Sequence, residues 1–451
     1  MTTALSPTLR HVAAEHLPRY TSYPTAPRFT PAIDSGVARQ WLAALDPKAT
    51  TSLYFHVPYC RALCWYCGCH TKIPADDAAI GRYVDTLVAE IDLVSSLLPA
   101  AARVTHLHWG GGTPTIVGPS AMLRIHDALV RAFRIAADAE LAIEIDPRML
   151  TADMAKALGA CGFNRASLGV QTFDPAVQNA IHRIQSEETT EAAADRLRAA
   201  GVRSLNVDLI YGLPHQTVAS CIGTAKRVLA FDPDRVAVFG YAHVPEAKPI
   251  QRHIDSAALP DAPTRFAQAE AIAEAFVSAG YRRIGLDHFA KPADAMAHAQ
   301  EAGTLHRNFQ GYTTDQADAL LGFGASAIGR LPQGYVQNTP RIAAYQEAIA
   351  ASRLATARGF ALGPEDRLRA AVIERLMCDL TVDFGAVAAA HLPGFDFSRE
   401  RAHLDRLAAE GLIEVSGTRL TVPETMRPFV RRVAAVFDTA RTTGATHAPA
   451  V

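Results

Sequence analysis

Short apolar runs alternate with segments of helical periodicity between residues 51 and 240, and this pattern limits the possible folds more than any other feature. The apolar runs predict strands at 53–57, 104–109, 141–145, 165–170, 205–210 and 235–240. Apolar residues recur at helical spacing at 80–98, 119–133 and 187–200. Strands that alternate with helices imply right-handed crossovers and a parallel sheet, so six or more units predict a full or partial barrel. In such a barrel the chemistry lies at the C-terminal ends of the strands.

The sequence on either side of this region has a different character. The first fifty residues lack a repeating pattern and carry a Tyr/Pro-rich patch at 19–29. We interpret residues 1–50 as an N-terminal arm that covers the active site at the barrel mouth. From 361 to 451 the pattern predicts three short helices, at 366–378, 384–391 and 398–411, and then two strands around a Ser-Gly turn. We interpret this part as a mostly helical, winged-helix-like domain that acts as a cap, and assign 51–360 to the barrel with its extension.

Bulk properties narrow the class of protein. A length of 451 residues predicts two or three units. The formal net charge is -1 and no basic block is present, so nucleic acid is not an expected partner. The N-terminus lacks a secretory signal, and no run reaches the roughly 18 apolar residues of a membrane span. We therefore expect a cytoplasmic monomer that does not bind a membrane.

Four of the seven cysteines, Cys60, Cys64, Cys67 and Cys69, fall within one decapeptide. Such clustering in a reducing compartment indicates metal or redox chemistry. The C-x3-C-x2-C spacing allows one loop to hold an iron–sulfur cluster, and three ligands leave one iron open. A zinc site usually needs two knuckles separated by a longer loop. A thioredoxin-like motif at Cys64 and Cys67 would leave the other two cysteines without a role.

The C-x3-C-x2-C motif after a first strand resembles the signature of radical S-adenosylmethionine (SAM) enzymes. The resemblance implies an α/β fold, a partial (β/α)6-type parallel barrel, in which Cys60, Cys64 and Cys67 bind a [4Fe–4S] cluster. SAM would then chelate the fourth iron. Cys69, the arm sequence at 19–26 and the segments at 241–245, 285–290 and 305–314 are similar to a narrower family, the oxygen-independent coproporphyrinogen III oxidases.

Several residues after the predicted strands match cofactor positions of this family. A glycine-rich turn follows the second strand, and Glu144 lies between two isoleucines, where a carboxylate is costly without a partner. A tight turn between strand and helix is the alternative interpretation of the glycines. The resemblance implies SAM contacts from Tyr54, Gly111, Gly112, Thr113, Glu144, Gln171, Arg183 and Asp208. It also implies a second SAM near the first, bound by Ala242, Phe309, Gln310 and Ile328.

The resemblance implies an activity as well. A 5′-deoxyadenosyl radical removes hydrogen from a propionate β-carbon, and loss of CO2 and one electron leaves a vinyl group. Two rounds convert coproporphyrinogen III to protoporphyrinogen IX in haem biosynthesis, with an electron donor and an acceptor that leave no visible motif. The alternatives are a haem-binding chaperone or a haem-modifying enzyme of the same superfamily. Such chaperones usually have phenylalanine in place of Cys69 and lack the arm.

The four carboxylates of that substrate are expected to meet arginines, because the guanidinium fork matches a carboxylate. Arg19, Arg28 and Arg307 are the candidates in the sequence. Ordinary surface ion pairs are the alternative role for each of them.

Overall fold

The computed structural model describes residues 11–12 and 15–439. Six parallel strands stand side by side in chain order, which confirms the predicted α/β partial barrel. They are β1 (Thr50–Val57), β2 (Arg103–Gly111), β3 (Arg134–Ile145), β4 (Arg165–Gln171), β5 (Ser204–Tyr211) and β6 (Arg235–Gly240). Strand β3 begins earlier than predicted because Ile135 pairs with Val104 of β2, although the residues after it form no apolar run.

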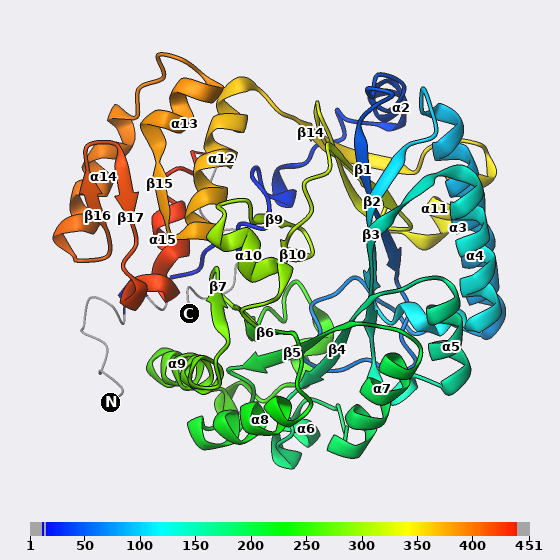
Figure 1. Cartoon of the computed structure of the whole chain (residues 1–451), viewed down its shortest axis with the longest axis horizontal. Coiled ribbons are helices and arrows are strands. Elements are labelled where there is room, and N and C mark those ends of the chain that lie inside the picture. The colour runs from blue at the N-terminus through cyan, green and yellow to red at the C-terminus, as the bar shows by residue number, and fades with distance from the viewer. Residues whose placement is uncertain (1–10, 13–14, 440–451) are drawn as a thin grey trace.

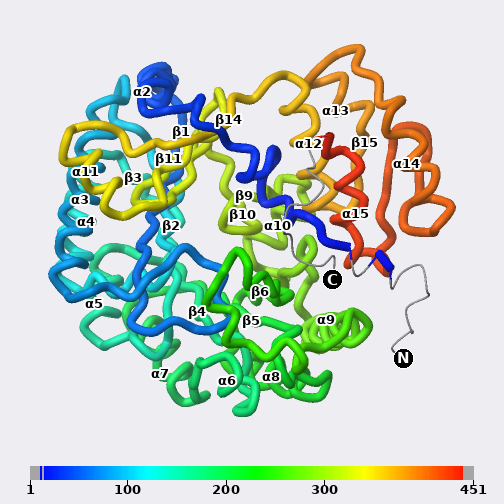
Figure 2. Tube along the Cα trace, turned by 180° about the vertical axis from the view of Figure 1, so that it is seen from behind, coloured from blue at the N-terminus to red at the C-terminus, as the bar shows by residue number. Residues whose placement is uncertain are grey.

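The sheet continues beyond these six strands on both sides. On one side β11 (Ala319–Phe323) lies parallel to β1 and is followed by antiparallel β12 (Ile328–Leu331), β13 (Gly334–Asn338) and β14 (Thr356–Ala361). On the other side β8 (His288–Ala290) and β7 (Arg282–Ile284) follow β6. Strands β1 and β6 are therefore not neighbours, and the barrel stays open. A separate hairpin, β9 (His306–Asn308) and β10 (Gly311–Thr313), lies between the two sides in both views (Figures 1 and 2).

Helices cover the outer face of the parallel strands (Figure 1). They are α3 (Asp77–Leu97), α4 (Pro119–Ala132), α5 (Ala152–Ala160), α6 (Pro175–Ala180), α7 (Glu187–Ala199), α8 (Val218–Ala230) and α9 (Ala262–Ser278), and the extension adds α10 (Ala295–Glu301) and α11 (Ile342–Ala350). Side chains of Thr151, Ser186 and Thr217 cap three of these helices by accepting backbone N–H bonds, as N-cap residues do.

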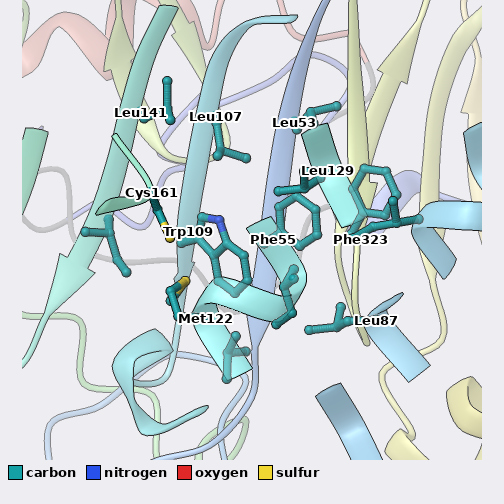
Figure 3. Close-up of a cluster of buried hydrophobic side chains, with 14 of the residues drawn as sticks. Leu53, Phe55, Leu87, Leu107, Trp109, Met122, Leu129, Leu141, Cys161 and Phe323 are labelled. Carbon is teal, nitrogen blue, oxygen red and sulfur yellow. The ribbon is translucent and has the colours of Figure 1, made fainter. Parts of the chain in front are cut away.

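Aromatic stacking fixes the core between the sheet and these helices. The Phe55 ring lies 4.7 Å from the Trp109 ring and 4.7 Å from the Phe323 ring, stacked against both (Figure 3). All three side chains are almost completely buried. The three neighbouring strands β11, β1 and β2 are thus joined by one apolar layer, which holds the strand ends in a fixed order.

The C-terminal region forms its own core. Helices α12 (Pro364–Asp379), α13 (Phe384–His391), α14 (Ser398–Ala409) and α15 (Val430–Ala434) pack around β15 (Thr381–Asp383), β16 (Glu414–Ser416) and β17 (Arg419–Thr421). The three predicted helices and the hairpin are confirmed. Strand β15 was not predicted because it is only three residues long and gains its partners from β17.

The N-terminal region connects the two cores. Tyr20 and Tyr23 are buried in the C-terminal core, whereas Ala38 and Leu42 belong to the barrel core. Figure 2 shows the chain running from the C-terminal region past the β9–β10 hairpin to α2 (Ser35–Ala43). The helix α2 was not predicted, since only Ala38 and Leu42 are buried along it, and two residues do not make a visible stripe.

Within residues 11–12 and 15–439, the search for a helix with the length and apolar character of a membrane span finds none.

Candidate active site

The cysteine-rich segment forms a loop between β1 and α3. Its ends are joined by hydrogen bonds from Cys60 N to Lys72 O (3.0 Å) and from Lys72 N to Pro58 O (2.9 Å). Trp65 N donates to Ile181 O (3.0 Å), which ties the middle of the loop to the segment after β4. The loop lines a cavity of about 580 Å³, which we call the cysteine cavity, at the C-terminal ends of β2–β6.

Each of the three predicted cluster ligands accepts hydrogen bonds at sulfur. Cys60 Sγ accepts from the Thr71 and Thr113 hydroxyls at 3.3 and 3.4 Å. Cys67 Sγ accepts from Cys69 N at 3.4 Å. Hydrogen-bond donors stabilise a thiolate, which is the form that binds iron. Hydrogen bonds from Cys69 accordingly lower the pKa of the Cys67 thiol.

Cys64 is held by two arginines. Its sulfur accepts from Arg183 Nη1 at 3.5 Å and from Arg148 Nη2 at 3.8 Å. Asp146 pairs with both guanidinium groups, at 2.6 Å to Arg148 and 3.4 Å to Arg183. These arginines lower the pKa of the Asp146 carboxyl although burial opposes the charge. Asp146 and Arg148 were not predicted as site residues, although Asp146 directly follows β3 and lies two residues after Glu144.

The other three cysteines have a different environment. Cys161, Cys221 and Cys378 are buried. Burial raises the pKa of Cys161 to about 11 and that of Cys221 to about 12. Figure 3 shows Cys161 among apolar side chains of the barrel core. Such buried thiols behave as small hydrophobic core residues.

The glycine turn after β2 brings two strand ends close together. Gly112 N donates to Val57 O and Thr113 N to Tyr59 O, both at 2.8 Å. A Cβ atom on Gly112 would lie 2.5 Å from Tyr59 O, and Gly111 has a φ of +117°. Only glycine fits such an approach, so the turn brings backbone N–H groups beside the cysteine loop.

Polar side chains from successive strands line the same cavity. Glu144 on β3 accepts from Gly111 N at 3.1 Å. Asp208 on β5 accepts from Ser167 and Asn206 at 2.8 Å, and burial raises its pKa to about 6. Gln171 ends β4 with a φ of +69°, a conformation that non-glycine residues adopt mainly where the surroundings require it. Gly111, Gly112, Thr113, Glu144, Gln171, Arg183, Asp208 and Ala242 all line the cysteine cavity together with Cys60, Cys64 and Cys67.

Four predicted cofactor residues lie outside the lining of that cavity. Tyr54 lies on β1, with its hydroxyl 3.0 Å from His56 Nδ1. Gln310 lines a polar cavity of about 160 Å³ inside the barrel, which shares Glu144, Ser167, Asp208 and Phe239 with the cysteine cavity. Phe309 lines a third cavity beside Tyr20–Tyr23 and α12. Ile328 lies on β12 opposite Gln337 and lines none of the three.

The structure separates the three candidate arginines. Arg19 lines the cysteine cavity and donates to Gly240 O at 2.8 Å. Arg307 donates to the Arg19 carbonyl at 3.3 Å, so these two lie together. Arg28 instead lies over the Phe360 ring, 5.8 Å from its centroid.

The donor set fits an iron–sulfur cluster and not a single metal ion. Within the described ranges, no three His, Cys, Asp or Glu side chains are grouped closely enough for one ion. A cubane is larger and takes each thiolate at a different iron. Three cysteines on one loop, each accepting hydrogen bonds at sulfur, match that requirement.

A cysteine loop after the first strand of an open parallel barrel is the site of the radical SAM class. A model of the Radical SAM superfamily matches residues 54–228. Members of this superfamily bind a [4Fe–4S] cluster and SAM.

Whole-chain comparisons define the family within this class. The chain is 56% identical to an oxygen-independent coproporphyrinogen III oxidase of Bradyrhizobium diazoefficiens and 45% identical to one of Paracoccus denitrificans, with 94% of each chain covered. It also matches the structure of coproporphyrinogen III oxidase (HemN) from Escherichia coli, which is described as a radical SAM enzyme, at 37% identity and a TM-score of 0.89. That match covers 98% of this chain and 100% of the other. The chain therefore belongs to the oxygen-independent coproporphyrinogen III oxidase family, as its sequence predicted.

Proposed function

We propose that this enzyme carries out the oxygen-independent oxidation of coproporphyrinogen III, a step of haem biosynthesis. Two propionate side chains each lose one hydrogen atom, one electron and CO2, and become the vinyl groups of protoporphyrinogen IX. The observation that carries the proposal is the cysteine cavity itself. It joins the three hydrogen-bonded cysteines to the strand-end residues Glu144 and Asp208, in a chain that shares 56% of its residues with an oxidase of this name.

Cys60, Cys64 and Cys67 would hold the cluster, with Arg183 and Arg148 orienting Cys64 through its sulfur. When bound, the cluster and SAM supply the one-electron chemistry and the radical that removes hydrogen from the substrate. Glu144 and the turn of Gly111, Gly112 and Thr113 lie where they would bind the polar part of SAM. Holding the reactants in one geometry and excluding water is the protein's contribution to such chemistry.

We also propose that the enzyme binds a second SAM molecule next to the first. The barrel cavity lined by Gln310 adjoins the cysteine cavity through Glu144 and Asp208, which supports a second binding position. Ala242 lines the cysteine cavity, whereas Phe309 and Ile328 would have to move or act from a distance. Equilibrium dialysis of the reconstituted enzyme is expected to give two SAM per chain, and one SAM in Gln310→Ala. One SAM in both proteins would rule out the second site.

Other expectations from the sequence stay predictions. They are that residues 1–50 form an arm over the active site, that the domain boundaries lie near 51 and 361, and that the protein is a cytoplasmic monomer. The need for an electron donor and an electron acceptor is likewise a prediction.

The test is an anaerobic assay of enzyme reconstituted with iron and sulfide. SAM, a one-electron reductant, an electron acceptor and coproporphyrinogen III are added, and the porphyrins are separated by chromatography. The divinyl product is expected from the wild type and from Cys161→Ala, and not from Cys64→Ala. Cleavage of SAM with the porphyrinogen unchanged would contradict the substrate and turn attention to haem binding.

A further inference from the structure

The Trp65 side chain does not line the cysteine cavity, although Trp65 directly follows Cys64, whose side chain does. Trp65 instead packs between two exposed imidazoles that are also absent from the cavity lining. The ring centroids of His182 and His253 each lie 5.2 Å from that of Trp65, at interplanar angles of 11° and 27°. The cysteine loop therefore presents an aromatic stack to the outside, one residue away from a proposed cluster ligand.

Hydrogen bonds hold this stack in place from both sides. Trp65 N donates to Ile181 O at 3.0 Å, which ties the loop to the residue before His182. His182 has a φ of +53°, a conformation that non-glycine residues keep mainly where the surroundings require it. The buried Gln251 side chain donates to the backbone of the cysteine loop at 3.0 Å and so fixes the turn that carries His253. The stack is therefore a fixed part of the surface.

Two exposed apolar side chains flank the same stretch of the loop. Arg148 and Arg183 line the cavity and contact Cys64 Sγ, and their direct chain neighbours Met149 and Ile184 are 43% and 60% exposed. Within residues 11–12 and 15–439 six large hydrophobic side chains are exposed, so two beside one sulfur atom are a local concentration. Exposed apolar groups that gather at one place mark an interaction surface. We call the following residues the outer face: Trp65, His182, His253, Met149 and Ile184.

The polar groups at the rim of the outer face are basic. Arg252 is exposed beside His253 and forms no ion pair within the described ranges. Arg61, on the cysteine loop, is paired with Asp77 at 2.7 Å. The unpaired charge at this rim is therefore positive. A partner with an acidic surface fits it, because complementary charges speed association and orient the two proteins.

The proposed chemistry requires an electron to reach the cluster while the cavity is filled. SAM and the tetrapyrrole would occupy the cysteine cavity, so a donor protein cannot approach the cysteines from that side. The outer face lies on the same loop but outside the cavity lining. A carrier docked over Trp65 would face the residue that adjoins Cys64 in the chain.

We propose that the outer face is the docking site of a one-electron donor protein with an acidic surface, which carries a flavin or an iron–sulfur cluster near that surface. The inference rests on the proposed function. The donor loses one electron and the cluster on the three cysteines gains it, and no bond forms or breaks. Met149 and Ile184 would form the apolar centre of the contact, with Arg252 at its polar rim, which is the usual anatomy of a protein interface.

The test measures docking and cluster reduction separately. Full-length enzyme reconstituted with iron and sulfide is titrated by calorimetry with flavodoxin, an acidic flavin protein. Ile184→Asp and Arg252→Glu are each expected to weaken flavodoxin binding by roughly 10-fold, the effect of losing one important interface contact. The second-order rate of cluster reduction by reduced flavodoxin, followed by stopped-flow absorbance, is expected to fall by a similar factor. Reduction by titanium(III) citrate, a small reductant, and binding of SAM are expected to stay unchanged.

Val130→Asp and Arg203→Glu are the matched controls. Val130 is 55% exposed on α4, and Arg203 is exposed directly before β5. Both line a groove at the N-terminal ends of the strands, at the opposite end of the barrel from the cysteine loop. Each control changes the charge as its test variant does, and its affinity for flavodoxin is expected to equal that of the wild type.

The outcomes separate the possible failures. If both test variants bind flavodoxin as the wild type does, or if the wild type does not bind it, no such donor docks on the outer face. If reduction by titanium(III) citrate slows as much as reduction by flavodoxin, these residues act on the cluster itself and the assignment is wrong. If flavodoxin docks and reduces the cluster but coproporphyrinogen III is not converted, the proposed function fails while the docking site stands. If no cluster forms, both fail.

Discussion

The cysteine cavity shares Arg19 and Gly240 with a smaller neighbouring cavity, and the two cavities are built in different ways. We call the smaller one the arginine cavity, because it is lined by Arg19, Arg265, Arg283, Arg307 and Arg431. The three cysteines come from one short loop, and the cations beside them are paired, since Asp146 binds both Arg148 and Arg183. The arginines come from the N-terminal segment, α9, β7, β9 and α15. The comparison teaches that one short loop is enough to bring the three cysteines together, whereas the arginines meet only when segments from both ends of the chain pack together.

The largest effect is expected on the reaction rate, from the substitution Gly112→Ala in the glycine turn beside the cysteine loop. The new methyl group would come within 2.5 Å of Tyr59 O and 2.6 Å of Thr71 Oγ1, so the cysteine loop must shift. A displacement of this size at a reacting centre costs roughly 100-fold in rate. Initial rates and bound iron in the anaerobic assay measure it. Gly81→Ala, which meets no atom within 4 Å, is the control, and equal activity of the two variants would show that the turn tolerates a side chain.

The paired cations predict a second effect, on stability. Asp146→Asn leaves Arg183 buried without its carboxylate, and breaking a buried pair costs about 3 kcal/mol or more. The free energy of unfolding of the apoprotein in urea measures the loss. Asp153→Asn removes an exposed carboxylate 3.6 Å from Lys156 and should change little. An equal response from both variants would mean that the pairing beside Cys64 contributes no stability.

A pH effect on stability is expected from the buried Glu90 on α3. Burial raises its pKa from 4.5 to about 7, although Tyr345, Gly324 and Asn338 donate hydrogen bonds to it. The folded state therefore binds the proton more tightly than the unfolded state. The contribution of Glu90 to stability is then present below about pH 4.5 and is lost as the pH rises through about 7, a change on the order of 3 kcal/mol.

Glu90→Gln removes this titration. The difference in unfolding free energy between wild type and variant is expected to change between pH 4.5 and 7, as measured by urea denaturation across that range. A constant difference would contradict the assignment.

The smallest effect on the free energy of unfolding is expected from a substitution in the arginine cavity. This result would contrast with the large loss expected from Asp146→Asn. Arg307→Met removes the 3.3 Å bond to Arg19 O but also removes two buried donor atoms, Nε and Nη1, that have no hydrogen-bond partner among the described residues. The two terms oppose each other, so we expect the free energy of unfolding of the unliganded protein to change by less than about 1 kcal/mol. A loss as large as that from Asp146→Asn would mean that Arg307 contributes to stability as much as the buried pair does, and the contrast between the two cavities would disappear.

Local patterns in the sequence were sufficient to predict much of the secondary structure and several of the residues that line the cysteine cavity. The strand positions followed from apolar runs, and eight of the predicted cofactor residues do line the cysteine cavity. Two elements were not predicted from the sequence. Strand β15 has only three residues, and helix α2 buries only two side chains. Phe309 and Ile328 lie away from the cysteine cavity, since their place depends on how the β9–β10 hairpin and β12 pack and not on their neighbours in sequence.

The sequence by itself determined the cofactor end of the site. Cys60, Cys64 and Cys67 are close in the chain, and the ends of consecutive parallel strands meet at one edge of the sheet, so spacing and periodicity place these groups together. Only the tertiary structure decided the arginine end. Arg19, Arg265, Arg307 and Arg431 meet because the N-terminal segment and α15 pack across the open side of the barrel. Contacts between segments so far apart in the chain depend on long-range packing, and no local pattern in the sequence encodes them.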